Sequence, residues 1–510
     1  MDPIELSLFA SRIEAICDEM GAALRRTAFS PNIRDRLDFS CAVFAAQGEL
    51  CAQAAHIPVH LGSMAYAMRG IVSQLDWCEG DMVVVNDPFL GGTHLPDITV
   101  IAPLLLDGEL LGFVANRAHH ANIGAHAPGS MPISRSLDEE GLVIPPTLLM
   151  RAGKVDEILL GRLADGREEA RGDFTAQVSA NLTALVRLRD LVQGLGAAAY
   201  RAALDALNDY AERLARTALA EIPGGEYVFA DVLDDDGVGS QDLTIAARVT
   251  VASGTVVVDF SGTAPQVPGN VNCPLSVAAA AVYYVFRCLM PRETPACAGA
   301  FRAISLDAPV GCLLNAQRPA AVAAGNVETS TRVVDVICGA LAQAIPDRMP
   351  AASHGSMNNV AMGARGGGRD WDYYETIGGG MGAGMHGGGL DAVQTHMTNT
   401  LNTPIESLES AYPLRVTRYA LRRGSGGAGV RRGGDGIVRE FQFLAPAQVT
   451  LLTERRRHAP WGLAGGCPGA PGQNRRNDML LPGKVSLGVD SGDRIIIATP
   501  GGGGWGEKEV

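Results

Sequence analysis

The sequence predicts an α+β fold built in several layers, with a helix-rich N-terminal half and a strand- and glycine-rich C-terminal half. Three observations support this prediction. Residues 3–27 and 173–222 repeat apolar side chains at the spacing of amphipathic helices. Apolar runs flank Asp107-Gly108 within residues 98–118, a pattern typical of a β-hairpin. The chain also holds 62 glycines, concentrated after residue 350, where we expect short strands joined by tight turns.

The length of 510 residues exceeds one ordinary hydrophobic core, so we expect several packed units. The clearest boundary lies near Gly224, where helical patterning changes to strand-like patterning. We predict an N-terminal α+β domain, a helical hairpin, a second α+β domain and a glycine-rich, strand-rich region, at residues 1–172, 173–222, 223–345 and 346–510.

Composition and charge exclude several classes of protein. Apolar residues make up 47% of the chain and charged residues 19%, as in well-buried globular proteins. A net charge of −13 without long basic runs argues against nucleic acid and anionic membrane surfaces as partners. No apolar stretch reaches the ~18 residues of a membrane span, and the N-terminal segment lacks the pattern of a signal peptide. Ten cysteines without C-x-x-C spacing indicate a cytoplasmic protein with reduced thiols.

The predicted N-terminal elements are a helix, two short strands and a second helix, at Pro3–Thr27, Asp38–Phe44, Glu49–Ala54 and Ser63–Leu75. Ser63 is predicted to cap the second helix. His56 and His60 precede it, either as hydrogen-bonded packing residues or as groups that orient metal ligands through a second ring nitrogen. We interpret His56 as a packing residue and keep both interpretations for His60.

The stretch Asn86–His126 organises the rest of the chain and holds four of the ten histidines. It contains the predicted hairpin strands, at Ile98–Leu106 and Glu109–Ala118. Because a hairpin brings its far ends together, Asp97 must lie near His119 and His120. His94 joins them from the preceding loop. A His-x-x-Asp pair that faces a histidine across a hairpin is typical of a metal site.

The turn of the hairpin decides which histidine faces Asp97. A two-residue loop sets Asp97 opposite Ala118, so that His120 shares its face of the sheet. A three-residue loop with a bulge sets Asp97 directly opposite His119. The residues themselves leave both registers open.

Later elements follow the same logic. The pattern predicts two helices within Asp173–Ile222, broken near Gly194-Leu195-Gly196. Three strands and two helices come next, at Glu226–Leu233, Leu243–Val251, Thr255–Phe260, Pro274–Met290 and Ser330–Ala344. Ser330 or Thr331 is predicted to cap the last of these helices.

The glycine-rich segments do not indicate a nucleotide site. Two G-x-G-x-x-G matches begin at Gly382 and Gly424, but neither follows an apolar strand or opens a helix. A phosphate-binding G-x-x-x-x-G-K-[ST] loop is absent from the sequence. If ATP takes part, we expect another chain to bind it. The sequence identifies no catalytic nucleophile or general base, and His354, His386 and His396 are interpreted as loop residues.

Three motifs of this chain resemble the hydantoinase B/oxoprolinase family, which includes the metal-bearing large subunits of acetone-type carboxylases. They are NDPFLGGTHLPDI from residue 86, RAHHANIG from residue 117 and GNVETSTRVVD from residue 325. The resemblance implies that Asp38, His94, Asp97 and His119 bind a metal. It therefore favours the bulged register, with His120 as the alternative ligand. Without the resemblance, Asp38 would be interpreted as a turn residue before a strand.

The resemblance also implies a function. It indicates the metal-bearing subunit of an ATP-dependent cyclic amidohydrolase that uses Mn, Fe or Zn on a lactam or hydantoin. A hydantoinase A-like partner would bind ATP and phosphorylate the amide oxygen, within a hetero-oligomer such as a heterotetramer. An acetone- or acetophenone-type carboxylase subunit is the enzymatic alternative, which bicarbonate incorporation would reveal. A structural subunit that only stabilises an ATPase chain is the third hypothesis, which metal content would test.

Overall fold

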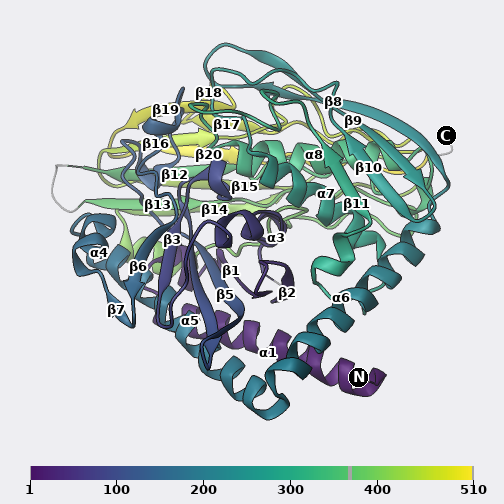
Figure 1. Cartoon of the computed structure of the whole chain (residues 1–510). Helices are drawn as coiled ribbons and strands as arrows, with labels where there is room; N and C mark the ends of the chain where they lie inside the picture. Colours follow the sequence, from purple (N-terminus) through teal and green to yellow (C-terminus); the bar gives the residue numbers. More distant parts are fainter. Residues whose placement is uncertain (1, 55, 366–369, 508–510) are drawn as a thin grey trace.

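The structure is a computed structural model that describes residues 2–54, 56–365 and 370–507. It is an α+β protein in which long helices and several β-sheets pack in layers (Figure 1). In the view of Figure 1, the helices α1 and α5 run along the bottom and the late strands β16–β20 lie at the top. The helices are α1, α2, α3, α4, α5, α6, α7, α8 and α9, at Pro3–Thr27, Pro31–Arg34, Pro58–Val72, Glu157–Ala164, Glu168–Leu195, Ala197–Ala220, Leu275–Leu289, Ser330–Leu341 and Ile405–Ala411.

A seven-stranded sheet in the N-terminal part has the order β2-β1-β5-β4-β3-β6-β7. Its strands β1 to β7 span Phe39–Ala45, Leu50–Gln53, Met82–Val85, Asp97–Leu106, Glu109–His119, Thr147–Arg151 and Lys154–Val155. The helices α1 and α5 contact one face of this sheet. The other face packs against α3, through a core that includes Phe44, Met64 and Phe113. Burial on both faces fixes the positions of the β4 and β5 ends, where the candidate site lies.

A four-stranded sheet with the order β11-β10-β9-β8 supports α8, which packs against β8 and β9. Its strands β8 to β11 span Gly225–Asp235, Gln241–Ala252, Thr255–Asp259 and Ile304–Asp307. The long hairpin of β8 and β9 alternates exposed and buried residues, as expected of a sheet with one covered face. This arrangement places the start of α8 between the hairpin sheet and the C-terminal part of the chain.

Two sheets in the C-terminal part share one core, with the orders β13-β12-β16-β19 and β14-β15-β20-β17-β18. Their strands β12 to β20 span Asn359–Ala364, Trp371–Glu375, Leu414–Arg422, Gly436–Phe443, Ala447–Leu452, Gln473–Arg476, Met479–Leu481, Lys484–Val489 and Arg494–Ala498. Alternation along β13 sends Tyr373 into this core and Tyr374 into the larger N-terminal core. The C-terminal sheets therefore contribute directly to the region around β4 and β5.

Glycine-rich segments at 380–390, 425–434 and 500–505 lie directly against one another. Gly380 N–H donates to Pro500 O at 3.0 Å, and Gly502 N–H donates to Gly434 O at 2.9 Å. A methyl group on Gly502 would overlap the carbonyl oxygen of Met381. Only glycine permits this backbone-to-backbone packing, which explains the glycine excess as structural and agrees with the interpretation against a nucleotide loop.

Several sequence predictions are confirmed and others are wrong. The helix α1 spans the predicted Pro3–Thr27, and α5 and α6 meet at Gly196 as expected. The helix α3 begins at Pro58, earlier than predicted, because proline at the first turn starts it and Ser63 Oγ bonds back to Val59 O. Likewise neither Ser330 nor Thr331 caps α8, because a π-helical turn at Gly325–Thr329 runs directly into it.

Buried apolar residues form a continuous core from Phe9 in α1 to Leu452 in β16. This core crosses the domain boundaries proposed after residues 172, 222 and 345, and these boundaries stay predictions. Within residues 2–54, 56–365 and 370–507, no helix combines the length and the apolar character needed to cross a membrane.

Candidate metal centre

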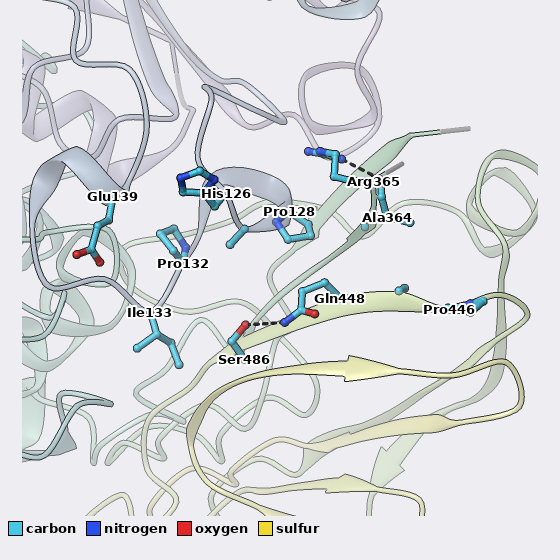
Figure 2. A pocket seen from close by; sticks show the side chains of 13 residues that line it. His126, Pro128, Pro132, Ile133, Glu139, Ala364, Arg365, Pro446, Gln448 and Ser486 are labelled. Carbon is cyan, nitrogen blue, oxygen red and sulfur yellow. Dashed lines mark hydrogen bonds between the residues drawn. The ribbon is translucent and has the colours of Figure 1, made fainter. Parts of the chain in front are cut away.

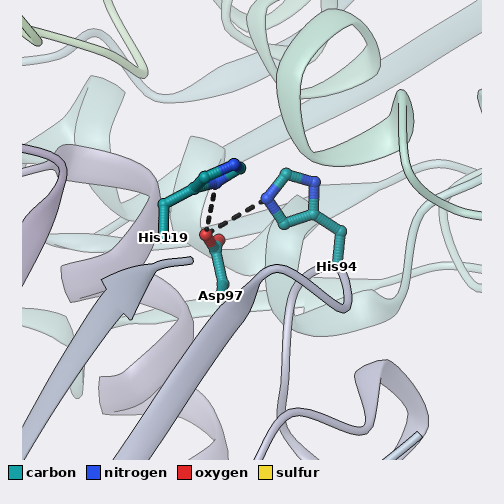
Figure 3. A group of neighbouring side chains, drawn as sticks. All are labelled: His94, Asp97 and His119. Atoms are coloured by element: carbon teal, nitrogen blue, oxygen red, sulfur yellow. Dashed lines mark hydrogen bonds and ion pairs between the residues drawn. The ribbon is translucent and has the colours of Figure 1, made fainter. Parts of the chain in front are cut away.

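The ends of β4 and β5 bring together three buried side chains. Asp97, the first residue of β4, pairs with His119, the last residue of β5. Asp97 Oδ1 lies 3.1 Å from His119 Nδ1 and 3.1 Å from Nε2 of His94, which projects from the preceding loop (Figure 3). Each of the three residues offers one possible ligand atom, and these three atoms all lie within 4.8 Å of one another. The predicted meeting of these three residues is confirmed.

The register of the hairpin combines features of both predicted alternatives. The turn is the two-residue loop, with Leu106 opposite Glu109, yet the register shifts between Leu104 and Leu105. One extra residue in β5 moves every later pair by one position. The bulge, rather than a longer loop, therefore sets Asp97 opposite His119.

His120, the alternative ligand, is engaged elsewhere. Its Nε2 lies 2.9 Å from Gln177 Oε1 in α5, and its ring packs 4.4 Å from that of Phe174. The two neighbouring histidines thus point into different environments, as alternation along an extended chain requires.

Asp97 is the electrostatic centre of the group. Burial raises the pKa of its carboxyl, but nearby His94 and His60 outweigh that effect and hold the pKa well below its usual range. For His94, burial lowers the pKa, and the adjacent Asp97 carboxylate reverses the balance so that the net pKa is raised. For His119, burial prevails and lowers the pKa. Asp97 therefore lies among several imidazoles and forms no ion pair with lysine or arginine among the described contacts, whereas the nearby Asp38 pairs with Arg36 at 3.7 Å.

Asp38 and His60 complete the pocket. Both line the same small cavity of about 20 Å³ as His94, Asp97 and His119. Asp38 lies just before β1, and its Oδ1 is 4.0 Å from His60 Nε2. His60 Nε2 is also 3.1 Å from Asp97 Oδ2, so this imidazole bridges the two carboxylates. The four predicted ligands share one pocket, and His60 is a fifth group that the sequence left open.

Pro58 was the signal that could have placed His60. Proline favours the first turn of a helix, and a helix that begins there carries His60 in its first turn. The helix predicted from Ser63 instead left His60 in a loop. His56 behaves as predicted: its Nδ1 accepts a hydrogen bond from Cys41 N–H at 3.2 Å, and its ring packs against Phe39.

The ring nitrogens of this pocket fit a metal ion. His94 Nδ1 lies 3.1 Å from the carbonyl oxygen of Ala323. A carbonyl only accepts, so Nδ1 carries a proton; in the neutral ring the lone pair is then on Nε2, which faces Asp97 Oδ1 at 3.1 Å. Nε2 of His94 and Nε2 of His119 are both buried and have no hydrogen-bond partner among the described residues. Buried, unpartnered imidazole nitrogens beside carboxylates match the donor set that Mn²⁺, Fe²⁺ or Zn²⁺ prefers.

The GNVET motif, whose chemistry could not be assigned from the sequence, lies against this pocket. Asn326 Nδ2 donates to Asp97 Oδ2 at 3.3 Å. Glu328 is fully buried, and its Oε1 accepts from Asn359 Nδ2 at 2.7 Å. Asn359 Oδ1 in turn accepts a hydrogen bond from the Tyr374 hydroxyl at 2.7 Å. The Tyr374 ring stacks on the His119 ring, with the ring centroids 4.6 Å apart. The motif therefore supports both an Asp97 oxygen and the His119 ring.

Glu140 supports His94 from the opposite side, and no sequence pattern marks it. Its Oε1 accepts from Val322 N–H at 2.8 Å and from Ala323 N–H at 3.0 Å. It thereby fixes the segment whose Ala323 carbonyl orients His94. Burial raises the pKa of Glu140 to about 7. The Glu140 carboxyl therefore holds the backbone segment whose carbonyl sets the tautomer of His94, and it links this ring to a buried hydrogen-bond network.

Other candidate residues lie outside the pocket. Asp87 caps the short helix Pro88–Leu90 and pairs with Arg318, as expected of a turn residue. A larger open cavity of about 760 Å³ lies between residues 126–139 and the strands β12, β16 and β19 (Figure 2). Gln448 and Ser486 are hydrogen-bonded at 3.1 Å on its floor. The pocket lined by Asp38, His60, His94, Asp97 and His119 is called the metal pocket below. The larger cavity shares none of its lining residues with it.

The chain belongs to the hydantoinase B/oxoprolinase family, because the family model matches residues 2–508. It is 38% identical to 5-oxoprolinase 1 of Arabidopsis thaliana over 99% of this chain and 42% of that protein. It is 32% identical to a putative D-/L-hydantoinase B subunit from a Pseudomonas species, over 99% of this chain and 90% of that protein. The chain thus spans about two-fifths of the plant relative and nearly all of the bacterial one.

Two solved structures share its fold. An ATP-dependent caprolactamase from Pseudomonas jessenii superposes with a TM-score of 0.92 at 29% identity, covering 99% of this chain and 91% of that one. Acetone carboxylase superposes with a TM-score of 0.88 at 18% identity, covering 99% of this chain and 76% of that one. The second likeness concerns the fold alone.

Proposed function

We propose that this chain is the metal-bearing subunit of an ATP-dependent cyclic amidohydrolase. The observation that carries the proposal is the buried His94–Asp97–His119 group with its two unpartnered ring nitrogens. Its support is membership of a family whose named relatives include 5-oxoprolinase, a hydantoinase subunit and a caprolactamase. The substrate class is a small cyclic amide, a lactam or a hydantoin.

In this proposal Asp38, His94, Asp97 and His119 hold a divalent Mn, Fe or Zn ion. Such a metal supplies Lewis acidity and lowers the pKa of water. The protein fixes the donors: Ala323 O sets the tautomer of His94, with Nε2 directed to the pocket.

The surrounding side chains hold Asp97 in place. Thr93 Oγ1 donates to Asp97 Oδ2 at 2.6 Å, and Asn326 Nδ2 donates to the same oxygen. These contacts leave Oδ1 directed toward the two histidines. Complete burial of Asp97 keeps bulk water away, which strengthens each electrostatic interaction inside the pocket.

ATP belongs to a partner in this proposal. The glycine-rich segments of this chain are filled by backbone packing rather than shaped as a phosphate loop. A hydantoinase A-like subunit would bind ATP and phosphorylate the amide oxygen, which turns a poor leaving group into a good one. We propose a hetero-oligomer such as a heterotetramer. More than half of the plant relative's length lies outside the match to this chain.

The first experiment measures metal content of the purified chain by elemental analysis. The parent is expected to hold about one equivalent of transition metal. His94→Ala and Asp97→Ala variants should lose it while circular dichroism shows that they remain folded. A parent that stays metal-free after supplementation, or variants that keep the metal, would contradict the ligand set and favour the structural-subunit hypothesis.

The second experiment adds the ATP-binding partner and follows ring opening together with ADP release. 5-Oxoproline, hydantoin and ε-caprolactam are the substrates to compare. Ring opening that needs both ATP and the metal supports the proposal. Incorporation of labelled bicarbonate into a ketone, without ring opening of any cyclic amide, would instead establish the carboxylase alternative.

A further inference from the structure

His60 lines the metal pocket but lies outside the proposed set of four ligands. Its side chain is 2% exposed, and its Nε2 lies 3.1 Å from Asp97 Oδ2 and 4.0 Å from Asp38 Oδ1. An imidazole in this place can act in two ways. An Nε2 with a lone pair would bind the metal as a fifth protein ligand, whereas an Nε2 that carries the proton would donate to nearby oxygen atoms. The tautomer of His60 therefore decides its role.

Ser40 in β1 sets this tautomer. Its Oγ lies 3.4 Å from His60 Nδ1 and accepts a hydrogen bond from Ile57 N–H at 3.2 Å. Ser40 is fully buried, and His60 Nδ1 is the only acceptor that its hydroxyl meets among the described residues. Because a buried hydroxyl donates wherever an acceptor is within reach, Nδ1 accepts this proton. The proton of the neutral His60 ring is therefore on Nε2.

The two proposed ligand histidines have the opposite arrangement. His94 Nδ1 faces the carbonyl oxygen of Ala323, and His119 Nδ1 faces Asp97 Oδ1, each at 3.1 Å. Both neighbours are acceptors, so in both neutral rings Nδ1 carries the proton and Nε2 has the lone pair. The pocket thus holds histidines of both tautomers, and His60 is the one that presents an N–H group at Nε2.

Close packing of two helices fixes the position of His60. It lies in the first turn of α3, which packs against α7. Two residues later, a methyl group on Gly62 would come within 2.5 Å of the Cα atom of Ala280 in α7. The two helices are therefore in direct contact at this turn. The distance of His60 from the carboxylates is set by the fold of the chain rather than by a bound ion.

The two oxygen atoms of Asp97 have different surroundings. Oδ2 accepts from Thr93 Oγ1 at 2.6 Å and from Asn326 Nδ2 at 3.3 Å, and His60 Nε2 is a third donor beside it. Oδ1 instead faces the two ligand histidines. A carboxylate oxygen has two lone pairs, so three donors occupy Oδ2 and leave Oδ1 for a metal.

We propose that His60 is a positioning residue that donates from Nε2 and does not itself bind the metal. It keeps Asp97 Oδ2 away from the ion, so that Asp97 binds through Oδ1 alone. It also flanks Asp38, whose other oxygen lies 3.7 Å from Arg36 Nη2. This inference deepens the proposed function and rests on it for the presence of the metal. Loss of the donor should weaken metal binding without changing the set of ligands.

Two amide variants separate a donor from a ligand. The amide nitrogen of glutamine takes the place of His60 Nε2, whereas that of asparagine takes the place of Nδ1, and both are N–H donors. The probe is Co²⁺, a coloured ion that accepts nitrogen and oxygen ligands as Zn²⁺ does. Competition with a chelator measures its affinity, and its visible absorption reports the number and kind of ligands.

His60→Gln should match the parent in both affinity and spectrum, because it restores the donor. His60→Asn should bind Co²⁺ about 10–100-fold more weakly, with the spectrum of the parent at saturation. His56→Asn is the matched control outside the pocket and should keep the parent affinity. Circular dichroism checks that all variants are folded.

Two results would overturn the proposal. A changed spectrum in both His60 variants would show that the imidazole is a metal ligand. Equal affinity in the parent and both variants would show that it is a packing residue.

Nitrogen-15 NMR tests the tautomer directly on the full chain loaded with Zn²⁺, which is diamagnetic. A ring nitrogen that carries a proton differs in chemical shift from one that does not. The signals of His60, assigned by their loss in His60→Gln, should show a proton on Nε2 and none on Nδ1. An Nε2 without a proton would overturn the proposal.

These results are separable from the test of the proposed function. The expected His60 effects on Co²⁺ binding, without ring opening by the assembled complex, would leave the inference standing and contradict the proposed function. Ring opening by a parent whose Co²⁺ spectrum changes in His60→Gln would do the reverse. A parent that binds no Co²⁺ would overturn both.

Discussion

Two groups of buried charges in this molecule have opposite character. The ionic cluster, between α8 and the C-terminal sheets, consists of Asp231, Arg332, Asp335, Glu454, Arg455 and Lys484. In it Arg455 Nη2 lies 2.8 Å from Asp231 and 2.6 Å from Asp335, and Lys484 Nζ lies 2.5 Å from Glu454. The metal pocket instead surrounds Asp97 with imidazoles.

Comparing the two groups shows how buried charges that stabilise the fold differ from buried charges that could bind a ligand. In the ionic cluster carboxylates meet arginine or lysine, so the charges compensate one another without a ligand. In the metal pocket Nε2 of His94 and Nε2 of His119 form no hydrogen bond with the described residues, so these two nitrogens could bind a positive ion. Burial alone does not distinguish the two groups, since both are almost fully buried. The kind of unpartnered atom distinguishes them: the ionic cluster leaves guanidinium N–H groups of Arg332 and Arg455, which cannot bind a cation, whereas the metal pocket leaves imidazole nitrogens, which can.

The ionic cluster should give the largest loss of stability when a cation is removed. Arg455→Met removes the closer of the two arginines that Asp231 and Asp335 share and leaves Arg332 at 3.7 and 3.9 Å, so the cost should lie at the lower end of the about 3–5 kcal/mol typical of breaking a buried ion pair. Urea unfolding measures the loss. Arg69→Met, at an exposed ion pair with Glu49, is the matched control and should change the free energy of unfolding by less than about 1 kcal/mol. Equal effects of the two variants would refute the structural role of the cluster.

Glu140 should make the stability of the metal-free protein depend on pH. Its pKa is raised from 4.5 to about 7 by burial, so folding favours the neutral acid. The stabilisation is complete below pH 4.5 and is lost as pH rises through about 7, by on the order of 3 kcal/mol.

Unfolding curves at several pH values in this range test that dependence. Glu140→Gln, which stays neutral, should show a smaller fall in stability between pH 4.5 and 7 than the parent. Glu328, whose pKa is also raised to about 7 by burial, should account for a remaining slope. An unchanged slope in Glu140→Gln would show that its carboxyl is not the titrating group.

Asn326 should affect metal affinity more than stability. Asn326→Ala removes the donor to Asp97 Oδ2, and loss of such a supporting contact typically weakens metal binding by about 10–100-fold. Competition with a chelator measures the affinity. An effect on chelator competition equal to that of Asp97→Ala would instead indicate that the side chain itself binds the metal.

His120 should have the smallest effect on the metal. His120→Asn keeps a polar group near Gln177 and leaves the Asp97 pocket intact, so the metal content should match the parent. His119→Asn, at the adjacent position, should lose the metal. Elemental analysis of the two variants measures the metal content. If only His120→Asn lost the metal, His120 rather than His119 would be the ligand.

The sequence predicted contacts that are local or that a hairpin enforces. The helix α1 and the meeting of Asp97 with His119 follow from spacing and turn chemistry. Contacts between distant segments left no such pattern: Arg455 and Asp231 are 224 positions apart, and Glu140 and Ala323 are 183 apart. These pairs form only when separate sheets pack together. The residues also left the hairpin register open, because the bulge falls within an apolar stretch of β5 whose neighbouring leucines look alike.

The glycine-rich segments bear on how the chain is made. The segment 380–390 hydrogen-bonds to residues 500–505, which are synthesised more than a hundred positions later. Until those residues emerge from the ribosome, its backbone groups lack their partners and remain solvated. The same contacts mean that the backbone at Met381 reaches its final packing only after translation has passed Gly502, whose backbone lies directly against the Met381 carbonyl. Packing of the segment 380–390 therefore depends on residues that are synthesised far later in the chain.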